Sequence, residues 1–298
     1  MHALGVLFCR PMYRHSGVDD PFTRDAELAE WMELEVHCAA AELIVEEEAE
    51  RALEHLPAGR GRSLLYRGVI LSAEQYEGLY EAAMDRGYML VTDPAQYERA
   101  LYLPEYYPAY ADVSPRTRWT YSDSLDEAWE AARELGPPPW LIKDHIKSAK
   151  EHWLEACYVP EGADRAAFDR CASRLIELHA DRFARGFVIR EFLQLAATGA
   201  RTAERRIPDE HRLFFWQGEL VAHAPYLDFG EPLTDTAPFE ALGRRIDSPF
   251  FTVDIAFLQD GGWIVVELND GGISGLPEQL DERALYGAIF GVPRDDYR

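Results

Sequence analysis

The lysines of this chain are the first residues whose type and spacing suggest chemistry. All three of them, Lys143, Lys147 and Lys150, fall within eight residues, and the other cations among the 30 lysines and arginines are arginines. An ammonium group on a flexible stem meets anions as a compact point charge, and phosphate oxygens are a frequent partner of such a group. The segment therefore predicts an anion-binding loop. A solvated turn in an arginine-biased chain is the alternative.

A second group of residues, more than a hundred positions downstream, predicts metal binding. Asp260-Gly261 separates two segments rich in β-branched and aromatic residues, a strong signal for a hairpin. A loop of two or four residues would place Asp254 opposite Glu267, with Asn269 on the same face. Carboxylate and amide oxygens suit Mg²⁺, which also takes phosphate oxygens. The alternative is a solvent-facing stripe of hydrated acids, and a three-residue loop would shift the pairing.

A further hairpin adds a cation. It is expected around Gln217-Gly218, and its first strand carries Arg212 on the same face as Phe214 and Trp216. This arginine would enter a sheet instead of extending from a loop. An ordinary arginine on an edge strand is the alternative interpretation.

The elements that position these residues begin with an open α/β pattern. Buried strands are expected at 4–9, 64–67 and 89–91, and Ser72 and Gln75 form the signature of a helix start between the last two. Residues 36–41 could be a strand or part of a helix. We expect a helix over 122–135 and then a linker at Gly136-Pro137-Pro138-Pro139, because successive prolines exclude helix. The predicted domains are therefore residues 1–135 and 136–298.

The second half is predicted to combine strands, one long helix and the two hairpins. A strand over 140–142 leads into the lysine segment, an amphipathic helix covers 164–183, and a strand over 187–189 runs into Arg190-Glu191-Phe192-Leu193. This mixture of α/β and α+β patterns is typical of a protein with more than one sub-domain.

Composition excludes several classes of partner. A net charge of −23 disfavours a nucleic-acid backbone or an anionic membrane as the main partner, although a local basic pocket could still hold an anionic ligand. The four cysteines form no CxxC pair, which predicts a reduced, cytoplasmic protein. The first residues resemble a strand and not a signal peptide.

Taken in order along the chain, these segments resemble the ATP-grasp superfamily, in particular the clade named for a signature arginine and two lysines. Tyr66-Arg67-Gly68 and the helix after Ser72 resemble the domain that precedes the grasp fold in that clade. The segments that carry the resemblance are Leu141-Ile-Lys143-Asp-His-Ile-Lys147-Ser148, Val188-Ile-Arg190-Glu191-Phe192-Leu193, Glu210-His-Arg212-Leu-Phe-Phe, Val253-Asp254 and Val266-Glu267-Leu-Asn269-Asp270-Gly271.

The resemblance implies a fold and a set of roles. An N-terminal Rossmann-like pre-ATP-grasp domain would precede a two-subdomain ATP-grasp fold, with subdomains at roughly 136–190 and 191–298. ATP would be the nucleotide, and Mg²⁺ would bridge its β- and γ-phosphates. The implied ligands are Lys143, Lys147 and Ser148 for the phosphates or purine, Glu191, Phe192 and Leu193 for the adenine, Asp254, Glu267 and Asn269 for Mg²⁺, and Arg212 for the transferred phosphoryl group. The chain departs from many such ligases because no glycine follows the lysines until Gly162.

The activity implied is that of a carboxylate–amine ligase. A substrate carboxylate would attack the γ-phosphate, and an amine would displace phosphate from the acyl phosphate to form an amide. The substrates would be small molecules or peptides, a homo-oligomer is left open, and neither nucleic acid nor membrane is expected. The alternatives are a phosphotransferase on the same scaffold and a nucleotide-binding module without turnover.

Two further residues have open roles. Arg67 ends a predicted strand, where open α/β sheets place ligands, so it could hold a substrate carboxylate or form an interdomain salt bridge. Ser274 lies in Gly271-Gly-Ile-Ser-Gly275, which could cradle an anion of a substrate or could simply connect two elements.

Overall fold

A computed structural model describes residues 4–201, 206–227 and 229–291. Its contacts divide the chain into two compact units, each built from separated segments. Unit 1 comprises Met1–Ala100, His211–Val253 and Leu268–Arg298, and unit 2 comprises Leu101–Glu210 and Asp254–Glu267. The proline segment at 136–139 lies within unit 2, and the division into domains 1–135 and 136–298 stays a prediction. Within the described residues, no helix combines the length and apolar character needed to cross a membrane.

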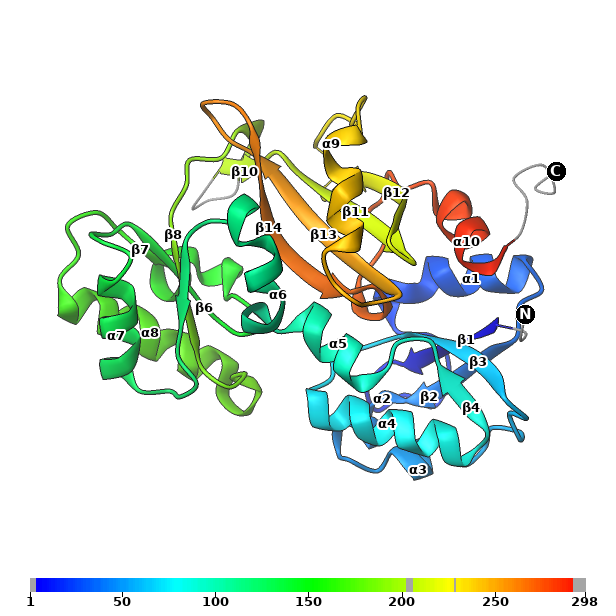
Figure 1. Cartoon of the computed structure of the whole chain (residues 1–298). Helices are drawn as coiled ribbons and strands as arrows, with labels where there is room; N and C mark the ends of the chain where they lie inside the picture. Colours follow the sequence, from blue (N-terminus) through cyan, green and yellow to red (C-terminus); the bar gives the residue numbers. More distant parts are fainter. Residues whose placement is uncertain (1–3, 202–205, 228, 292–298) are drawn as a thin grey trace. The chain divides into compact units, whose positions relative to one another are not determined.

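The N-terminal part of unit 1 is a parallel sheet in the order β2-β1-β3-β4 (Figure 1). The ambiguous segment at 36–41 is thus mainly a strand. The helix α4 begins at a capping box in which the Ser72 hydroxyl accepts from the N–H of Gln75, as predicted. The elements are β1 (Leu4–Arg10), α1 (Thr23–Trp31), β2 (Val36–Ala40), α2 (Ala41–Val45), α3 (Ala49–Ala52), β3 (Arg62–Arg67), α4 (Ala73–Asp85), β4 (Tyr88–Leu90) and α5 (Pro94–Leu101).

One apolar cluster of unit 1 packs against one face of this sheet. Val6 and Phe8 of β1 pack in one buried apolar cluster with residues of α1 and of α10 (Glu282–Phe290). Figure 1 shows α1 and α10 close together, and the Tyr286 hydroxyl of α10 donates to Asp25 of α1 at 2.7 Å. Residues distant in sequence thereby complete the N-terminal domain.

Unit 2 contains an antiparallel sheet in the order β5-β8-β6-β7. The helices α7 and α8 pack together beside it, and their apolar faces share a core that includes Ala128, Phe168 and Leu175 (Figure 1). The elements are α6 (Leu103–Tyr110), β5 (Thr117–Trp119), α7 (Leu125–Arg133), β6 (Trp140–Asp144), β7 (Tyr158–Val159), α8 (Arg165–His179), β8 (Phe187–Glu191) and the pair β9 (Ala197–Arg201) and β10 (Arg206–Pro208).

Both predicted hairpins form. The first turns at Gln217-Gly218, where both residues have positive φ. The second turns at Asp260-Gly261, and its strands run from one unit into the other. The order of this sheet is β12-β11-β13-β14. Its elements are β11 (Glu210–Trp216), β12 (Glu219–Pro225), α9 (Ala237–Glu240), β13 (Phe250–Phe257) and β14 (Trp263–Asp270).

Candidate active site

Lys143 and Glu267 form a shielded ion pair in unit 2. The ammonium nitrogen of Lys143 lies 2.5 Å from Oε1 of Glu267 and donates to the carbonyl of Ile146 at 2.9 Å. Burial alone would raise the pKa of Glu267, but the ammonium groups of Lys143, Lys150 and Lys147 outweigh it and hold this pKa well below its usual range. Lys143 therefore contacts a carboxylate that the family resemblance assigns to a metal, and the charges of Lys150 and Lys147 also favour the ionised form of that carboxylate.

The turn of the second hairpin differs from expectation. The N–H of Leu258 donates to the carbonyl of Gly262 at 3.1 Å, and the N–H of Gly261 donates to the carbonyl of Leu258 at 3.1 Å. These bonds close a three-residue loop, so the predicted loop of two or four residues was wrong. Gly261, the last residue of this loop, has positive φ, and so does Gly262, the residue after it. The irregular backbone therefore extends one residue beyond the loop. That Asp254 and Glu267 face each other therefore remains a prediction.

The opposite end of the same hairpin is described within unit 1. There the hydroxyl of Thr252 donates to the carbonyl of Asn269 at 3.5 Å, so these two residues lie close together on neighbouring strands. Asn269 is buried, and its side-chain oxygen has no hydrogen-bond partner among the described residues. A buried amide oxygen without a donor is costly unless something else satisfies it, which singles Asn269 out as a potential ligand.

Asp144 organises the lysine loop, and sequence analysis assigned it no role. This residue is 1% exposed, and its Oδ1 accepts the N–H groups of Ile146 at 2.7 Å and Lys147 at 2.5 Å. Its Oδ2 lies 2.6 Å from Nδ1 of His179, at the end of α8, and accepts the N–H of Ala184 at 3.3 Å. One carboxylate thus ties the backbone between Lys143 and Lys147 to α8. The sequence did contain a signal for this role, because aspartate commonly forms turns by bonding a backbone N–H two residues later. Asp144 does so with Ile146.

Arg190 is a second residue whose role sequence analysis missed. Its guanidinium donates to the carbonyls of Val266 at 2.5 Å and Val265 at 3.5 Å, next to Glu267. Burial lowers the pKa of Arg190, against the attraction of residues that include Tyr106 and Glu267. The arginine therefore holds the strand that carries Glu267, and the match of its segment to the family motif was the only available signal.

Most polar groups of Glu191 and Phe192, in the segment expected to bind adenine, form hydrogen bonds within the protein. Arg116 contacts the Glu191 carboxylate through its backbone N–H and through Nε, both at 2.8 Å. The N–H of Glu191 donates to the carbonyl of Arg116 at 2.9 Å, and that of Phe192 to the carbonyl of Pro139 at 3.2 Å. No hydrogen bond from the N–H of Leu193 is found among the described residues. The Phe192 ring meets Tyr158 edge to face, with centroids 5.0 Å apart.

Arg212 and Ser274 are described within unit 1, where both contact the segment after β14. Arg212 is 7% exposed, donates to the carbonyl of Gly275 at 3.2 Å, and lies over the ring of Tyr226 at 4.6 Å. The Ser274 hydroxyl lies 2.9 Å from that of Thr252 and donates to the carbonyl of Asp270 at 2.9 Å. These contacts of Ser274 are internal and favour the connecting role over the substrate-binding role.

Arg67 also belongs to a buried cluster of unit 1. It is 1% exposed, and its Nε and Nη2 donate to Oδ1 of Asp25 at 2.9 and 2.6 Å. Its Nη1 donates to the carbonyls of Gly271 and Ser274. The structure therefore shows an ion pair, as one alternative held, but the pair lies inside unit 1 and not between domains. An arginine enclosed in this way is unsuited to a substrate carboxylate.

Comparisons with known proteins identify the family of the chain. The model of family 3 of the ATP-grasp domain, in the clade named for a signature arginine and two lysines, matches residues 134–289, more than half of the sequence. The chain belongs to this ATP-grasp family. It is accordingly an enzyme of the ATP-dependent ligase class. A comparison with curated proteins finds no significant match.

Solved structures show the same fold at low identity. A RimK domain ATP-grasp protein from Sphaerobacter thermophilus is similar over 97% of this chain and 95% of its own, with 14% identity and a TM-score of 0.57. D-cycloserine synthetase DcsG is similar over 90% and 91%, with 15% identity and a TM-score of 0.57. The ATP-grasp ligase PsnB, in complex with minimal precursor, Mg and ADP, is similar over 90% and 89%, with 12% identity and a TM-score of 0.51. These likenesses support the expected pre-ATP-grasp and ATP-grasp architecture.

The residues of this ATP-grasp chain fit a magnesium ion that also binds phosphate. No cluster of three His, Cys, Asp or Glu able to hold a metal is found in the part of the chain that the structure describes. The expected set contains only two such residues, Asp254 and Glu267, together with the amide of Asn269. Mg²⁺ in nucleotide sites commonly uses one or two carboxylates and completes its shell with phosphates and water. The unsatisfied oxygen of Asn269 and the ionised Glu267 are consistent with that arrangement.

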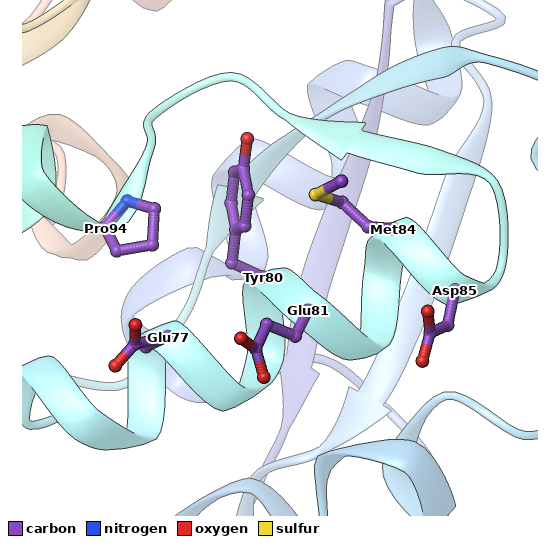
Figure 2. Close-up of a pocket in the computed structure, with 6 residues that line it drawn as sticks. All are labelled: Glu77, Tyr80, Glu81, Met84, Asp85 and Pro94. Atoms are coloured by element: carbon purple, nitrogen blue, oxygen red, sulfur yellow. The ribbon is translucent and has the colours of Figure 1, made fainter.

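A surface groove on α4 belongs to none of these groups. Figure 2 shows its six lining residues, with Tyr80 between Pro94 and Met84 and three carboxylates along the helix. The side chain of Tyr80 is partly buried and lines the groove. None of the candidate site residues lines this groove, so we assign it no part in catalysis.

Proposed function

We propose that this ATP-grasp enzyme is an ATP- and Mg²⁺-dependent carboxylate–amine ligase that forms an amide or peptide bond through an acyl phosphate. The observation that carries the proposal is the shielded ion pair of Lys143 and Glu267, 2.5 Å apart, at the start of the segment that also carries Lys147 and Lys150. A site that keeps cations and a carboxylate together in shielded surroundings provides partners for phosphate and for a divalent metal alike.

The lysine loop supplies the proposed phosphate contacts. Asp144 orients the backbone of this loop through hydrogen bonds to the N–H groups of Ile146 and Lys147. Lys143 starts from β6, so its ammonium group is held on a rigid element, whereas Lys147 is exposed to the solvent from which an anion would arrive. Ser148 is partly buried next to Lys147 and would add a hydroxyl donor. Such preorganised positive charge is the main contribution a protein makes to phosphoryl transfer.

The proposed metal ligands are Asp254, Glu267 and Asn269. Glu267 and Asn269 are two residues apart on β14, so their side chains share a face of that strand. When bound, Mg²⁺ would supply Lewis-acid stabilisation of the charge on the β- and γ-phosphates. Arg190 holds the carbonyls of Val265 and Val266 and thereby fixes the strand just before Glu267.

The adenine would be read by the segment after β8. Because the N–H groups of Glu191 and Phe192 donate within the protein, the N–H of Leu193 is the backbone donor we assign to the base. The Phe192 ring, supported by Tyr158, would pack against the purine. Arg212 would stabilise the transferred phosphoryl group.

The proposed reaction has two steps. A carboxylate oxygen of the first substrate forms a bond to the γ-phosphorus while the bond from that phosphorus to the bridging oxygen breaks, releasing ADP. The amine nitrogen of the second substrate then bonds to the carbonyl carbon of the acyl phosphate. The C–O bond to phosphate breaks, the amine loses a proton, and inorganic phosphate leaves. No covalent bond to the protein is required.

A substrate screen tests the proposal. The full chain is incubated with ATP, Mg²⁺ and paired panels of carboxylic acids and amines, and products are identified by mass spectrometry. A product with the summed mass of both substrates less one water, with one ADP and one phosphate per product, is expected. A phosphorylated product without free phosphate would establish the phosphotransferase instead. ATP binding without turnover across the panels would favour the inactive nucleotide-binding module.

Variants connect the activity to the site. Glu267→Gln should lower Mg²⁺-dependent turnover by roughly 100-fold, because a metal ion contributes several kcal/mol of charge stabilisation. Glu81→Gln, the same change on an exposed position of α4, should leave turnover unchanged. Lys143→Arg should weaken ATP binding by about tenfold, since a planar guanidinium does not fit a point-charge site. Wild-type ATP affinity in that variant would contradict the proposed phosphate role.

A further inference from the structure

The buried carboxylate of Asp144 lies between the lysine loop, residues 143–147, and the end of α8, all within unit 2. Its Oδ1 accepts from the N–H groups of Ile146 and Lys147, and its Oδ2 accepts from a backbone N–H of the segment after α8. Among the described residues, one side chain adds a further donor to this carboxylate: Nδ1 of His179 lies 2.6 Å from Oδ2. His179 therefore completes the hydrogen bonds around a group that cannot turn to solvent.

The ring of His179 donates in this contact. A carboxylate that already accepts three backbone N–H groups acts as an acceptor, so the nitrogen that faces it, Nδ1, carries a hydrogen. Nδ1 bears a hydrogen in one neutral tautomer of imidazole and also in imidazolium. The contact between His179 and Asp144 therefore depends on a donor at this position and not on a positive charge.

The backbone that follows His179 is held in an uncommon conformation. His179 is the last residue of α8, and Ala180, directly after it, has a φ of 47°. Arg185 is a second non-glycine residue with positive φ, at 60°, and between the two the N–H of Ala184 donates to Oδ2 of Asp144 at 3.3 Å. Non-glycine residues keep such conformations where the surrounding contacts impose them. The connection from α8 to β8 thus presents two donors to one carboxylate.

The second half of the lysine loop depends on how Asp144 is oriented. The N–H groups of Ile146 and Lys147 both donate to Oδ1, and the N–H of Asp144 donates to the carbonyl of Lys147 at 3.0 Å. The terminal torsion of an aspartate has only a broad preference of its own, so contacts to its second oxygen decide where the first oxygen points. His179 and Ala184 make those contacts. His179 therefore fixes the acceptor that places the backbone of Ile146 and Lys147.

We propose that His179 is a positioning residue for phosphate binding. By donating from Nδ1 to Asp144, it holds the lysine loop in the conformation that binds the phosphates of ATP. This inference rests on the proposed function, in which the lysine loop supplies the phosphate contacts. A loop that is ordered before the ligand arrives binds more tightly, because less conformational entropy is lost on binding. His179 itself does not contact the nucleotide, so a ligand without phosphates should not depend on it.

Two variants separate the donor at Nδ1 from the rest of the side chain. In His179→Asn the amide nitrogen can take the position of Nδ1, whereas the longer side chain of His179→Gln carries its amide beyond that position. Isothermal titration calorimetry gives the Kd of ATP with Mg²⁺ and the Kd of adenosine. His179→Gln should raise the Kd of ATP by roughly tenfold, as expected for one lost charge-assisted hydrogen bond. His179→Asn should stay within about twofold of the wild type, and the Kd of adenosine should be the same in all three proteins.

Hydrogen exchange of the free protein gives a readout that needs no ligand. The N–H groups of Ile146 and Lys147 should exchange roughly tenfold faster in His179→Gln than in the wild type, because the acceptor that protects them is less well held. His179→Asn should retain most of the protection. The control is His55→Gln, the same change at an exposed histidine of unit 1, and it should match the wild type in both measurements.

The outcomes distinguish this inference from the ligase proposal. A wild-type Kd for ATP in His179→Gln overturns the inference, and so does a His179→Asn variant that is as weak as His179→Gln. An equal loss of affinity for ATP and adenosine, as general unfolding would give, also overturns it. If the variants behave as expected but no product forms with any substrate pair, the positioning role stands and only the ligase reaction fails.

Discussion

The ammonium nitrogen of Lys143 and the carboxylate of Glu267 lie 2.5 Å apart, with side chains only 9% and 13% exposed. The sequence suggested that Glu267 would face another acid and that a cation would relieve the repulsion. Instead, lysines from a different segment already neutralise this carboxylate. In the proposed function, Lys143 would exchange this partner for phosphate, and Glu267 would be one of the residues that hold Mg²⁺.

A double-mutant cycle tests this pair. Lys143→Met should lower the free energy of unfolding by about 3 kcal/mol, because it leaves a shielded carboxylate without its closest partner. Lys143→Met combined with Glu267→Gln should cost clearly less than the sum of the two single changes. The measurement is urea unfolding without nucleotide at constant ionic strength. Additive costs would mean that the two side chains do not interact in solution.

Asp144 should control ATP affinity through the loop that it holds. Asp144→Ala removes the acceptor for the N–H groups of Ile146 and Lys147 and should raise the Kd for ATP by roughly tenfold, an energy typical of lost charge-assisted hydrogen bonds. Isothermal titration calorimetry gives the Kd. Asp169→Ala, which removes a partly exposed ion pair with Arg165 on α8, is the matched control and should bind ATP normally. Equal affinity in both variants would leave Asp144 a purely structural role.

The Arg67–Asp25 pair should matter for stability. Arg67→Met leaves Asp25 buried without its cation and should cost about 3 kcal/mol of unfolding free energy or more. Adding Asp25→Asn should recover part of that loss, because the uncompensated charge is removed. Urea unfolding of the three variants supplies the comparison. If Arg67→Met keeps wild-type stability and raises only the KM of a carboxylate substrate, the substrate-binding interpretation would be restored.

A buried histidine should make stability depend on pH. Burial lowers the pKa of His145, whose ring nitrogen lies 2.7 Å from the carbonyl of Thr120. The unfolded chain, with an ordinary pKa of about 6.5, binds the proton first as pH falls, so this residue lowers stability below that pH. Asp270, whose pKa burial raises to about 7, acts in the opposite direction over the same range.

The test therefore compares how the unfolding free energy changes with pH in the wild type and in His145→Gln. From pH 7.5 to 5.5 the wild type should lose about 1 kcal/mol more unfolding free energy than the variant, because glutamine does not titrate. Urea unfolding at the two pH values measures both slopes. Parallel slopes would show that His145 is protonated as readily in the folded state as in the unfolded chain.

Local elements of this fold could be predicted because their determinants are close in sequence. The capping box of Ser72 and Gln75 involves residues three apart, and the turn at Gln217-Gly218 contains a glycine, which accepts positive φ readily. The second hairpin was predicted for the same reason. Its loop length was not, because Asp-Gly occurs in turns of several lengths and only the bonds between Leu258 and Gly262 decide among them.

Family membership could also be inferred from the sequence, because the order of the motif segments survives at low overall identity. The family match then covered residues 134–289. The compact units could not be inferred, since they are assembled from separated segments, and a linker of prolines does not reveal which contacts form around it.

The sequence by itself determined which side chains could do chemistry: three clustered lysines and a set of oxygen ligands near a hairpin. Only the tertiary structure decided how those groups pair. Lys143 meets Glu267 across 124 residues of sequence, and Arg67 meets Asp25 from another element. The physical reason is that ion pairs depend on distances of a few ångströms and on burial, and neither is encoded in the local spacing of residues.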